Sequence, residues 1–272
     1  MKFYKYMALS KNTLDAFINE YCWFSSPSAF NDPFDCALIK GDKMKEFFLE
    51  SKKVLCLARE HDNLLMWSHY ADSHRGICVE YTPFSTEEIC RLKEQGVFGD
   101  YPNDRLCIVQ NARKVEYRTT EQINNYLDAL PDTDQEFLSL HQQKIEEGST
   151  EEFYATISSA LTIKHESWAY ENEYRIIHDG ENRNTHPGKI TKIYIGAKAS
   201  PQDKRTLSMS IDESIELVCM DFSKTKYSLT ERSLQPKVDF AGLVFTLKNK
   251  HNKQFKSDSA RVAFLLCVGL SD

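Results

Sequence analysis

Residues 149–178 have the sequence STEEFYATISSALTIKHESWAYENEYRIIH, and the patterning changes from helical to strand-like within this stretch. Its first half, Ser149 to Ile163, opens with a Ser-x-x-Glu capping box and repeats apolar residues at helical spacing, which predicts a helix. Its second half predicts a strand over Glu173 to His178. Helix and strand are therefore grouped in separate runs here, rather than alternating regularly.

The same grouping extends outward along the chain. Helices predicted over 120–130, 134–146 and 149–163 form a helical insertion at about 119–164. Because helices cluster and strands come in runs, we expect an α+β fold with a mixed or largely antiparallel sheet. We expect one α+β domain over 1–234 and a C-terminal extension over 235–272. Two more helices are predicted over 43–50 and 64–70, and three others begin near Asn12, at Ser85 and near Ser200. Further predicted strands cover 53–58, 76–81, 189–195, 215–222 and 242–247.

Glycine is scarce, with 10 residues in a chain of 272. That share is about half of the usual figure of roughly 7%. No window fits G-x-G-x-x-G or G-x-x-x-x-G-K-[ST], so the signatures of a Rossmann dinucleotide site and of a P-loop are absent. Any nucleotide chemistry must therefore be held mainly by side chains.

The N-terminal residues and the cysteines predict a cytoplasmic location. The start, MKFYKYMALSKN, lacks the apolar run of a signal peptide, and no stretch approaches the ~20 apolar residues of a membrane span. The 8 cysteines include no C-x-x-C pair, and most lie in apolar runs. We expect free thiols packed as small hydrophobic residues, with no metal and no membrane contact.

Charge is spread unevenly over a chain of net charge −6. The segment 116–152 has ten acidic residues against two basic ones, and the segment 237–261 has six basic residues against two acidic ones. Both patterns are typical of solvated faces and tails. The alternative is that the acidic helices or the basic stretch contact a protein partner.

The block from Trp168 to Ile177 is the sharpest candidate for chemistry. On a strand, Glu171, Glu173 and Arg175 would share one face. Two carboxylates and a guanidinium are expensive to bury, so the pattern indicates either a surface ion pair on an edge strand or a catalytic group. In the catalytic interpretation, one glutamate stabilises an oxocarbenium-like centre and the other activates an acceptor.

A second block, residues 66–76, contains two histidines, an arginine and two large aromatic rings at a helix-to-strand junction. Histidines five residues apart diverge around a helix, and no H-E-x-x-H signature is present, so a metal site is not expected. We expect Arg75 to bind an anion and Trp67 or Tyr70 to stack on a ring. A histidine satisfied within the core remains the alternative for His69. The candidate binding residues of this block are Trp67, Ser68, His69, Tyr70, His74 and Arg75.

Two N-terminal segments complete the candidate site. Residues 3–6 predict an aromatic strand, which either packs at a sheet edge or offers Tyr6 to a ligand. Residues 24–35 contain Asn-Asp-Pro, which favours a fixed turn because proline excludes the preceding residue from the helical region. Anchored by Phe30 and Phe34, this loop is expected either to be purely structural or to line a pocket; its candidate binding residues are Ser25, Asn31 and Asp32.

Taken together, these blocks resemble a bacterial family known as domain of unknown function 2971. The matching segments are Tyr4-Lys5-Tyr6, Phe30 to Asp35, Met66 to Ala71, His74-Arg75-Gly76, and Trp168 to Arg175. The resemblance spans roughly Phe3 to Tyr227, and we expect the helical insertion and residues 235–272 to lie outside it. The family name implies no activity.

More distantly, the chain resembles ADP-ribosyltransferases of the Arg/Ser/Glu-x-Glu class. Lys5 or Tyr6 would take the first position, Ser25 or Ser26 the second, and Glu171 with Glu173 the third, although the chain has neither the arginine nor the Ser-Thr-Ser of that class. The resemblance implies NAD as co-substrate, a protein or nucleic-acid acceptor, and a toxin or phage-defence role.

Two other functions stay open at this point. One is a metal-independent nuclease that uses His69 or His74 together with Arg75. The other is a non-catalytic binding or immunity module whose contact surface is the acidic helical segment or the basic stretch.

Overall fold

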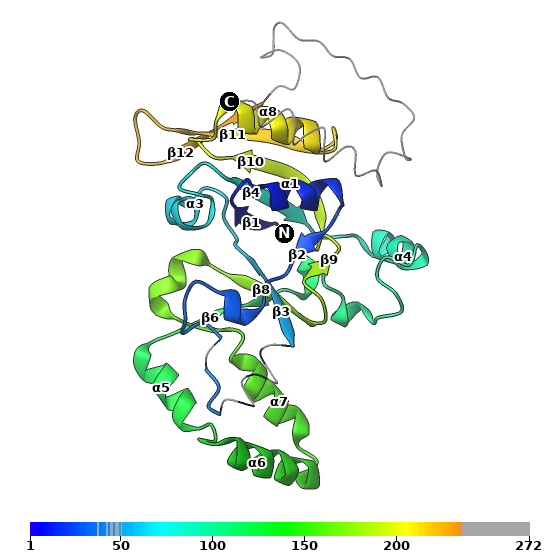
Figure 1. Ribbon diagram of the computed structural model, residues 1–272, viewed down its shortest axis with the longest axis vertical. Coiled ribbons are helices and arrows are strands. Elements are labelled where there is room, and N and C mark those ends of the chain that lie inside the picture. The colour runs from blue at the N-terminus through cyan, green and yellow to red at the C-terminus, as the bar shows by residue number, and fades with distance from the viewer. Residues whose placement is uncertain (37, 42, 44–45, 47–48, 50, 235–272) are drawn as a thin grey trace, which may run out of the picture. The chain divides into compact units, whose positions relative to one another are not determined.

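The computed structural model describes residues 1–36, 38–41, 43, 46, 49 and 51–234, and within them the fold is α+β (Figure 1). The predicted fold class is therefore confirmed. The helix predicted over 43–50 lies largely outside the described residues. The strand predicted over 242–247 and the basic stretch 237–261 lie wholly outside them.

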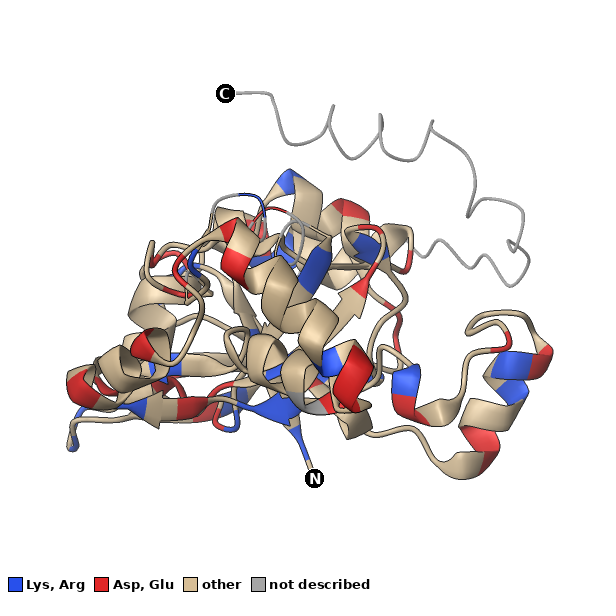
Figure 2. Cartoon of the chain, turned by 90° about the horizontal axis from the view of Figure 1, so that it is seen from below, with Lys and Arg blue, Asp and Glu red and all other residues tan. Residues whose placement is uncertain are grey.

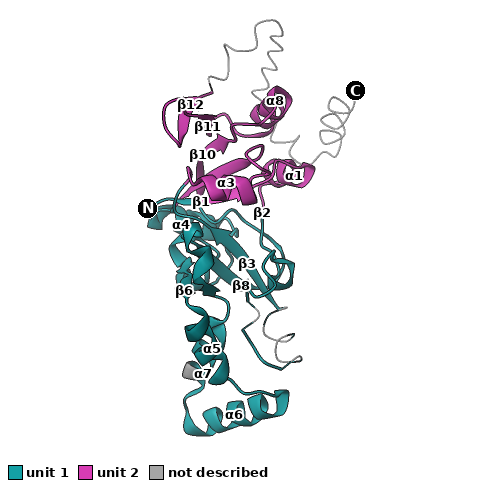
Figure 3. Ribbon diagram, turned by 90° about the vertical axis from the view of Figure 1, so that its left-hand side faces the viewer, with its two compact units in different colours: residues 1–3, 22–60, 83–188 teal, residues 4–21, 61–82, 189–272 magenta. Residues whose placement is uncertain are grey.

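The chain divides into two compact units, each assembled from separate segments (Figure 3). Unit 1 comprises residues 1–3, 22–60 and 83–188, and unit 2 comprises 4–21, 61–82 and 189–272. The block 168–177, called the E-x-E-x-R block after Glu171, Glu173 and Arg175, thus belongs to unit 1. The block 66–76, called the Trp67 block, belongs to unit 2.

Unit 2 is built on a five-stranded mixed sheet. Its strand order is β1 (Phe3–Met7), β4 (Ile77–Thr82), β10 (Lys189–Ile195), β11 (Glu216–Phe222) and β12 (Leu229–Ser233). The pair β10–β11 is parallel, whereas β4–β10 and β11–β12 are antiparallel. A parallel pair needs a long crossover, which α8 (Pro201–Ser210) supplies. The other helices are α1 (Lys11–Ile18) and α3 (Leu64–Tyr70).

Unit 1 is organised around β8 (Tyr174–Asp179). This strand lies between β3 (Lys52–Leu57) and β5 (Arg113–Lys114), and both neighbours are antiparallel to it. A residue on β8 therefore has a neighbouring strand on each side. The remaining elements are β2 (Cys22–Trp23) paired with β9 (Arg183–Asn184), α4 (Thr86–Glu94), and the 3₁₀ helices Pro27–Ala29, Asn103–Arg105 and Val109–Asn111.

The helical insertion lies within unit 1. It contains α5 (Thr120–Asp128), α6 (Asp134–Glu147) and α7 (Thr150–Ser159). The strands β6 (Glu116–Arg118) and β7 (Ile163–His165) pair in parallel on either side of it and close it off. The helix α7 ends four residues before the predicted Ile163, because that residue begins β7.

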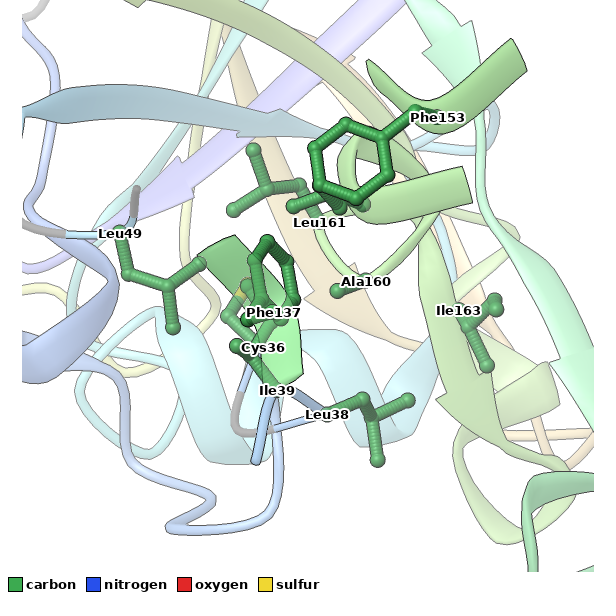
Figure 4. Packing of buried hydrophobic residues seen from close by; sticks show 10 residues of the cluster. Cys36, Leu38, Ile39, Leu49, Phe137, Phe153, Ala160, Leu161 and Ile163 are labelled. Carbon is green, nitrogen blue, oxygen red and sulfur yellow. The ribbon is translucent and has the colours of Figure 1, made fainter. Parts of the chain in front are cut away.

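A hydrophobic core joins the insertion to the segment after the Asn-Asp-Pro turn (Figure 4). Phe137 from α6 and Phe153 from α7 lie edge-to-face, with ring centroids 5.2 Å apart. The same cluster holds Cys36, Leu38 and Ile39. Burial of these side chains therefore holds Cys36, Leu38 and Ile39 against the helices of the insertion.

The described cysteines are all free thiols, as predicted, and most of them are buried. No helix among the described residues is long and apolar enough to cross a membrane.

Gly196 provides a test of the packing in unit 2. A Cβ atom at this position would overlap the carbonyl oxygen of His74, which is backbone and cannot move aside easily. We expect Gly196→Ala to destabilise the protein by about 1–3 kcal/mol, the usual cost of overpacking. Urea denaturation measures the change. Gly96→Ala is the control, because that glycine has open space around it and only its positive φ opposes a side chain. A smaller loss of stability for Gly196→Ala than for Gly96→Ala would contradict the close approach of His74 to Gly196.

Candidate functional site

Arg175 lies on the central strand β8 and is completely buried, with 0% of its surface exposed. Its guanidinium binds Glu173 in a bidentate manner, with Nε 2.8 Å from Oε1 and Nη2 3.0 Å from Oε2. Nη2 also donates to Oδ2 of Asp35 at 2.7 Å, and Nη1 donates to the carbonyl of Leu161 at 2.9 Å. A buried guanidinium needs such partners, and these come from three separate segments of unit 1.

Lys164 from β7 is the second buried cation. Its Nζ lies 2.5 Å from Glu171, 3.3 Å from Glu173 and 3.3 Å from Asp35. The ammonium also lies 4.8 Å from the ring centroid of Trp168, close enough for a cation–π contact.

We call Asp35, Lys164, Glu171, Glu173 and Arg175 the carboxylate cluster. Each member is more than 90% buried. Three carboxylates share two cations, so these five side chains carry one excess negative charge. Acidic and basic residues are interspersed along the helices and strands of the described chain (Figure 2). What distinguishes the cluster is its burial.

The cations keep Glu173 ionised. Burial would raise the pKa of Glu173, but the charge and hydrogen bonds of Arg175, with a contribution from Lys164, outweigh it and lower the pKa to about 2. Burial would lower the pKa of Lys164, but the carboxylates around it raise that pKa above its usual value. Glu173 and Lys164 therefore retain their charge at neutral pH.

Two sequence predictions about this block are wrong. Glu171 does not lie on a strand, because it ends the 3₁₀ helix η5 (Glu166–Glu171), and Asn172 then turns the chain with a left-handed φ of 43° before β8. The ion pair of Glu173 and Arg175 is not on a surface edge strand, since β8 is central and both side chains are buried. The three candidates meet nonetheless, because Lys164 bridges Glu171 to Glu173.

The Asn-Asp-Pro turn forms as predicted. The backbone N–H of Phe34 donates to the side chain of Asp32 at 2.9 Å, an Asx turn. Phe30 packs against the insertion core and lies 5.4 Å below the guanidinium of Arg175. The prediction that Phe34 also anchors the loop is wrong, because that ring is 80% exposed. Asn31 is also exposed.

Ser25 is fixed in place by backbone pairing. Its backbone N–H and carbonyl both pair with Val54 of β3, at 2.9 and 2.8 Å. The pairing attaches the segment that leads into the turn to the sheet around β8.

In unit 2 the aromatic candidates lie around α3. Trp67 is completely buried, and its indole N–H donates to the carbonyl of His61 at 2.7 Å. The ring of Tyr6 lies edge-to-face with it, with the centroids 5.3 Å apart, and His74 covers one side. Tyr70, by contrast, is half-buried.

The polar candidates of this block differ in exposure. The side chain of Arg75 is 58% exposed, and Oδ1 of Asp72 lies 3.9 Å away from its guanidinium. Ser68 and His69 are exposed, whereas His74 is buried. An exposed guanidinium with one distant ion pair can bind an anion.

The structure therefore gathers the candidates in two groups. Glu171, Glu173 and Arg175 meet in unit 1, where the turn of Asn31 and Asp32 leads directly into Asp35. Tyr6 and the Trp67 block gather in unit 2.

Sequence reasoning missed two members of the carboxylate cluster. Asp35 was visible only as the end of the Asn-Asp-Pro-Phe-Asp segment, and its role depends on the distant Arg175. Lys164 lies in an ordinary Ile-Lys-His strand, so no local pattern could have singled it out.

Unit 2 contains a further buried carboxylate that the sequence did not single out. Glu80 is 1% exposed and accepts hydrogen bonds from the hydroxyls of Tyr4 and Tyr194 at 3.2 Å and of Thr191 at 2.7 Å. The contacts link β4 to β1 and β10, which is a structural role for the aromatic N-terminal strand.

Among the described residues, no group of three or more His, Cys, Asp or Glu side chains is arranged to hold a metal ion. The oxygens of the carboxylate cluster accept from lysine and arginine instead.

The comparison with known families gives one match. Residues 66–176 match the DUF2971 family, described as proteins of unknown function. The match includes the Trp67 block and the E-x-E-x-R block. The matched range also spans the helical insertion. The segments Tyr4 to Tyr6 and Phe30 to Asp35 lie outside the match.

No curated protein and no solved structure matches the chain significantly. None of the comparisons points to ADP-ribosyltransferases.

Two ion pairs of the chain have the same geometry but differ in burial, so a comparison of the two isolates the effect of burial on stability. Glu116 and Arg118 form the same bidentate i,i+2 pair as Glu173 and Arg175, but they lie near the surface. We expect Glu173→Gln to destabilise the fold by about 3–5 kcal/mol, because it leaves buried cations without a counter-charge. Glu116→Gln should cost less than about 1 kcal/mol. Urea denaturation of both variants tests this, and equal losses would contradict it.

Acidic pH should remove the contribution of Glu173 to the free energy of unfolding. Its folded pKa of about 2 lies below the ordinary glutamate pKa of 4.5, so protonation favours the unfolded chain. The stabilisation is fully present above pH 4.5 and is lost as the pH falls toward 2. Denaturation curves between pH 7 and pH 2 should therefore be less pH-dependent for Glu173→Gln than for the wild-type chain. Parallel curves for the two proteins would exclude a depressed pKa.

Proposed function

We propose that the chain is an NAD-consuming enzyme similar to ADP-ribosyltransferases, which transfers ADP-ribose to an acceptor or to water in the cytoplasm. The observation that carries the proposal is the excess negative charge of the carboxylate cluster. Both the nicotinamide ring of NAD and the ribose centre left after its departure are positively charged. A buried carboxylate group with one unbalanced charge is complementary to such a cation.

The two glutamates have different environments, which suits two different roles. Glu173 is held by the bidentate guanidinium and stays ionised, so it can stabilise the oxocarbenium-like ribose centre. Glu171 is held through Lys164 at the end of η5, so it can accept a proton from the attacking hydroxyl or water. Arg175 is a positioning residue, because it fixes Glu173 from within the strand.

Aromatic rings lie beside the carboxylate cluster. Trp168 and Tyr170 are both half-buried on η5, with ring centroids 6.0 Å apart, and Lys164 connects Trp168 to Glu171. In the proposal these rings stack on the nicotinamide or the base.

The binding roles of the other candidates remain predictions. Arg75 stays the residue expected to bind an anion, and Tyr70 a ring expected to stack. Asn31 and Asp32 of the turn would contact the ribose. Consumption of NAD would suit a toxin or a phage-defence effector, acting on a protein or nucleic-acid acceptor.

Nicotinamide release tests the proposal. The purified chain is incubated with NAD, alone and with a cell lysate as acceptor, and nicotinamide is measured by chromatography. Glu171→Gln should lower release about 100-fold or more, because it removes the charge and the base while keeping the shape. Glu166→Gln is the matched control, since this exposed residue begins the same 3₁₀ helix.

Circular dichroism and thermal melting confirm that each variant is folded. Trp168→Ala leaves the cluster charges in place and should raise the KM for NAD. Absence of nicotinamide release under every condition, or an unchanged rate in Glu171→Gln, would overturn the proposal.

A further inference from the structure

A serine and a histidine of the Trp67 block lie within hydrogen-bond distance in unit 2. Oγ of Ser68, on α3, is 3.2 Å from Nε2 of His74 in the following loop. The serine is exposed to solvent, whereas the histidine is 8% exposed. A hydroxyl open to solvent with a buried imidazole behind it is the arrangement of a nucleophile and its general base.

The imidazole of His74 is held by rings on two elements. The ring of Trp67 is nearly parallel to it, at 10° and a centroid distance of 6.3 Å, and the ring of Phe222 on β11 lies 5.3 Å away. Trp67 is itself fully buried, so it cannot move without disturbing the core. Packing thus fixes the direction in which Nε2 points.

The backbone at His74 is held in an unusual conformation. Asp72, Ser73 and His74 have successive φ values of 44°, 52° and 69°, a left-handed run without a glycine. The backbone N–H of His74 donates to the carbonyl of Trp67 at 3.1 Å, and its own carbonyl accepts from the N–H of Lys198 at 2.9 Å. Strain of this kind persists only where surrounding contacts determine it, and it is common at reactive sites.

The protonation of His74 suits a base. Burial, and then the charge of Lys198, lower the pKa of His74, so the imidazole is neutral at pH 7. Its Nδ1 atom is buried and has no hydrogen-bond partner among the described residues. Protons therefore reach and leave the ring through Nε2, the nitrogen that faces Ser68.

We infer that Ser68 and His74 form a nucleophile–base pair that accepts acyl groups from activated carboxylic esters. The inference is independent of the NAD chemistry proposed for unit 1. Oγ of Ser68 attacks the carbonyl carbon while its proton passes to Nε2 of His74. The bond from that carbon to the leaving oxygen then breaks, and the proton is returned to the leaving group. Water hydrolyses the acyl-serine in a second step and restores the hydroxyl.

No carboxylate or other acceptor among the described residues orients Nδ1 of His74. The imidazolium that forms during attack therefore lacks the counter-charge of a full triad. We expect rapid formation of the acyl-serine only with good leaving groups, followed by slow hydrolysis.

The test uses p-nitrophenyl acetate as the probe and the full chain as the protein. The wild-type chain should release a burst of p-nitrophenolate, and peptide mass spectrometry should find an acetyl group on Ser68. Ser68→Ala should abolish the burst. His74→Gln should slow it about 100-fold, because a general base contributes at least that factor.

Ser208→Ala is the matched control and should leave the burst unchanged. Ser208 is another helical serine of unit 2, but its hydroxyl donates to the carbonyl of Arg205 in its own helix at 2.8 Å. Because Ser68 is exposed, its substitution should leave the thermal melt unchanged. The mapping of the acetyl group on the wild-type chain does not depend on any variant folding. Absence of acetyl-Ser68 in the wild-type chain, or an unchanged burst in His74→Gln, would overturn the inference.

Discussion

The burial of the Arg175 guanidinium is the constraint on which unit 1 depends. A permanent positive charge inside a protein requires counter-charges and an acceptor for each N–H group. Asp35 from the turn and Leu161 from the end of the insertion come from distant parts of the chain, whereas Glu173 lies two residues before Arg175. Satisfying one side chain therefore fixes two distant segments relative to the central strand.

Lys164 extends this constraint to the helical insertion. It lies on β7, directly after the insertion, and it contacts all three carboxylates. The hydrophobic core that contains Phe137 and Phe153 also includes Ile163 of the same strand. Apolar burial and ion pairing thus act on the same stretch of chain. The result is a fixed, buried group of three carboxylates and two cations.

Local sequence patterns predicted most of the helices and strands near the site, but not which of their residues come into contact. The helices α3, α5 and α6 and the strand β10 begin where the sequence indicated, because capping residues and apolar spacing are local signals. The prediction for Glu171 was wrong, since Asn172 adopts a left-handed conformation that strand alternation does not anticipate. Phe34 was expected in the core and is exposed, because the Asx turn directs the chain outward there.

The sequence by itself determined the α+β class, the helical insertion, the fixed Asn-Asp-Pro turn and the E-x-E-x-R candidates, all of which depend on neighbours within a few residues. Only the tertiary structure decided that these candidates are buried, that Asp35 and Lys164 complete the cluster, and that Ser68 faces His74. The reason is physical. The energy of a buried charge depends on which distant groups surround it, and those groups are brought together by β8 and the strained loop after α3, not by spacing along the chain.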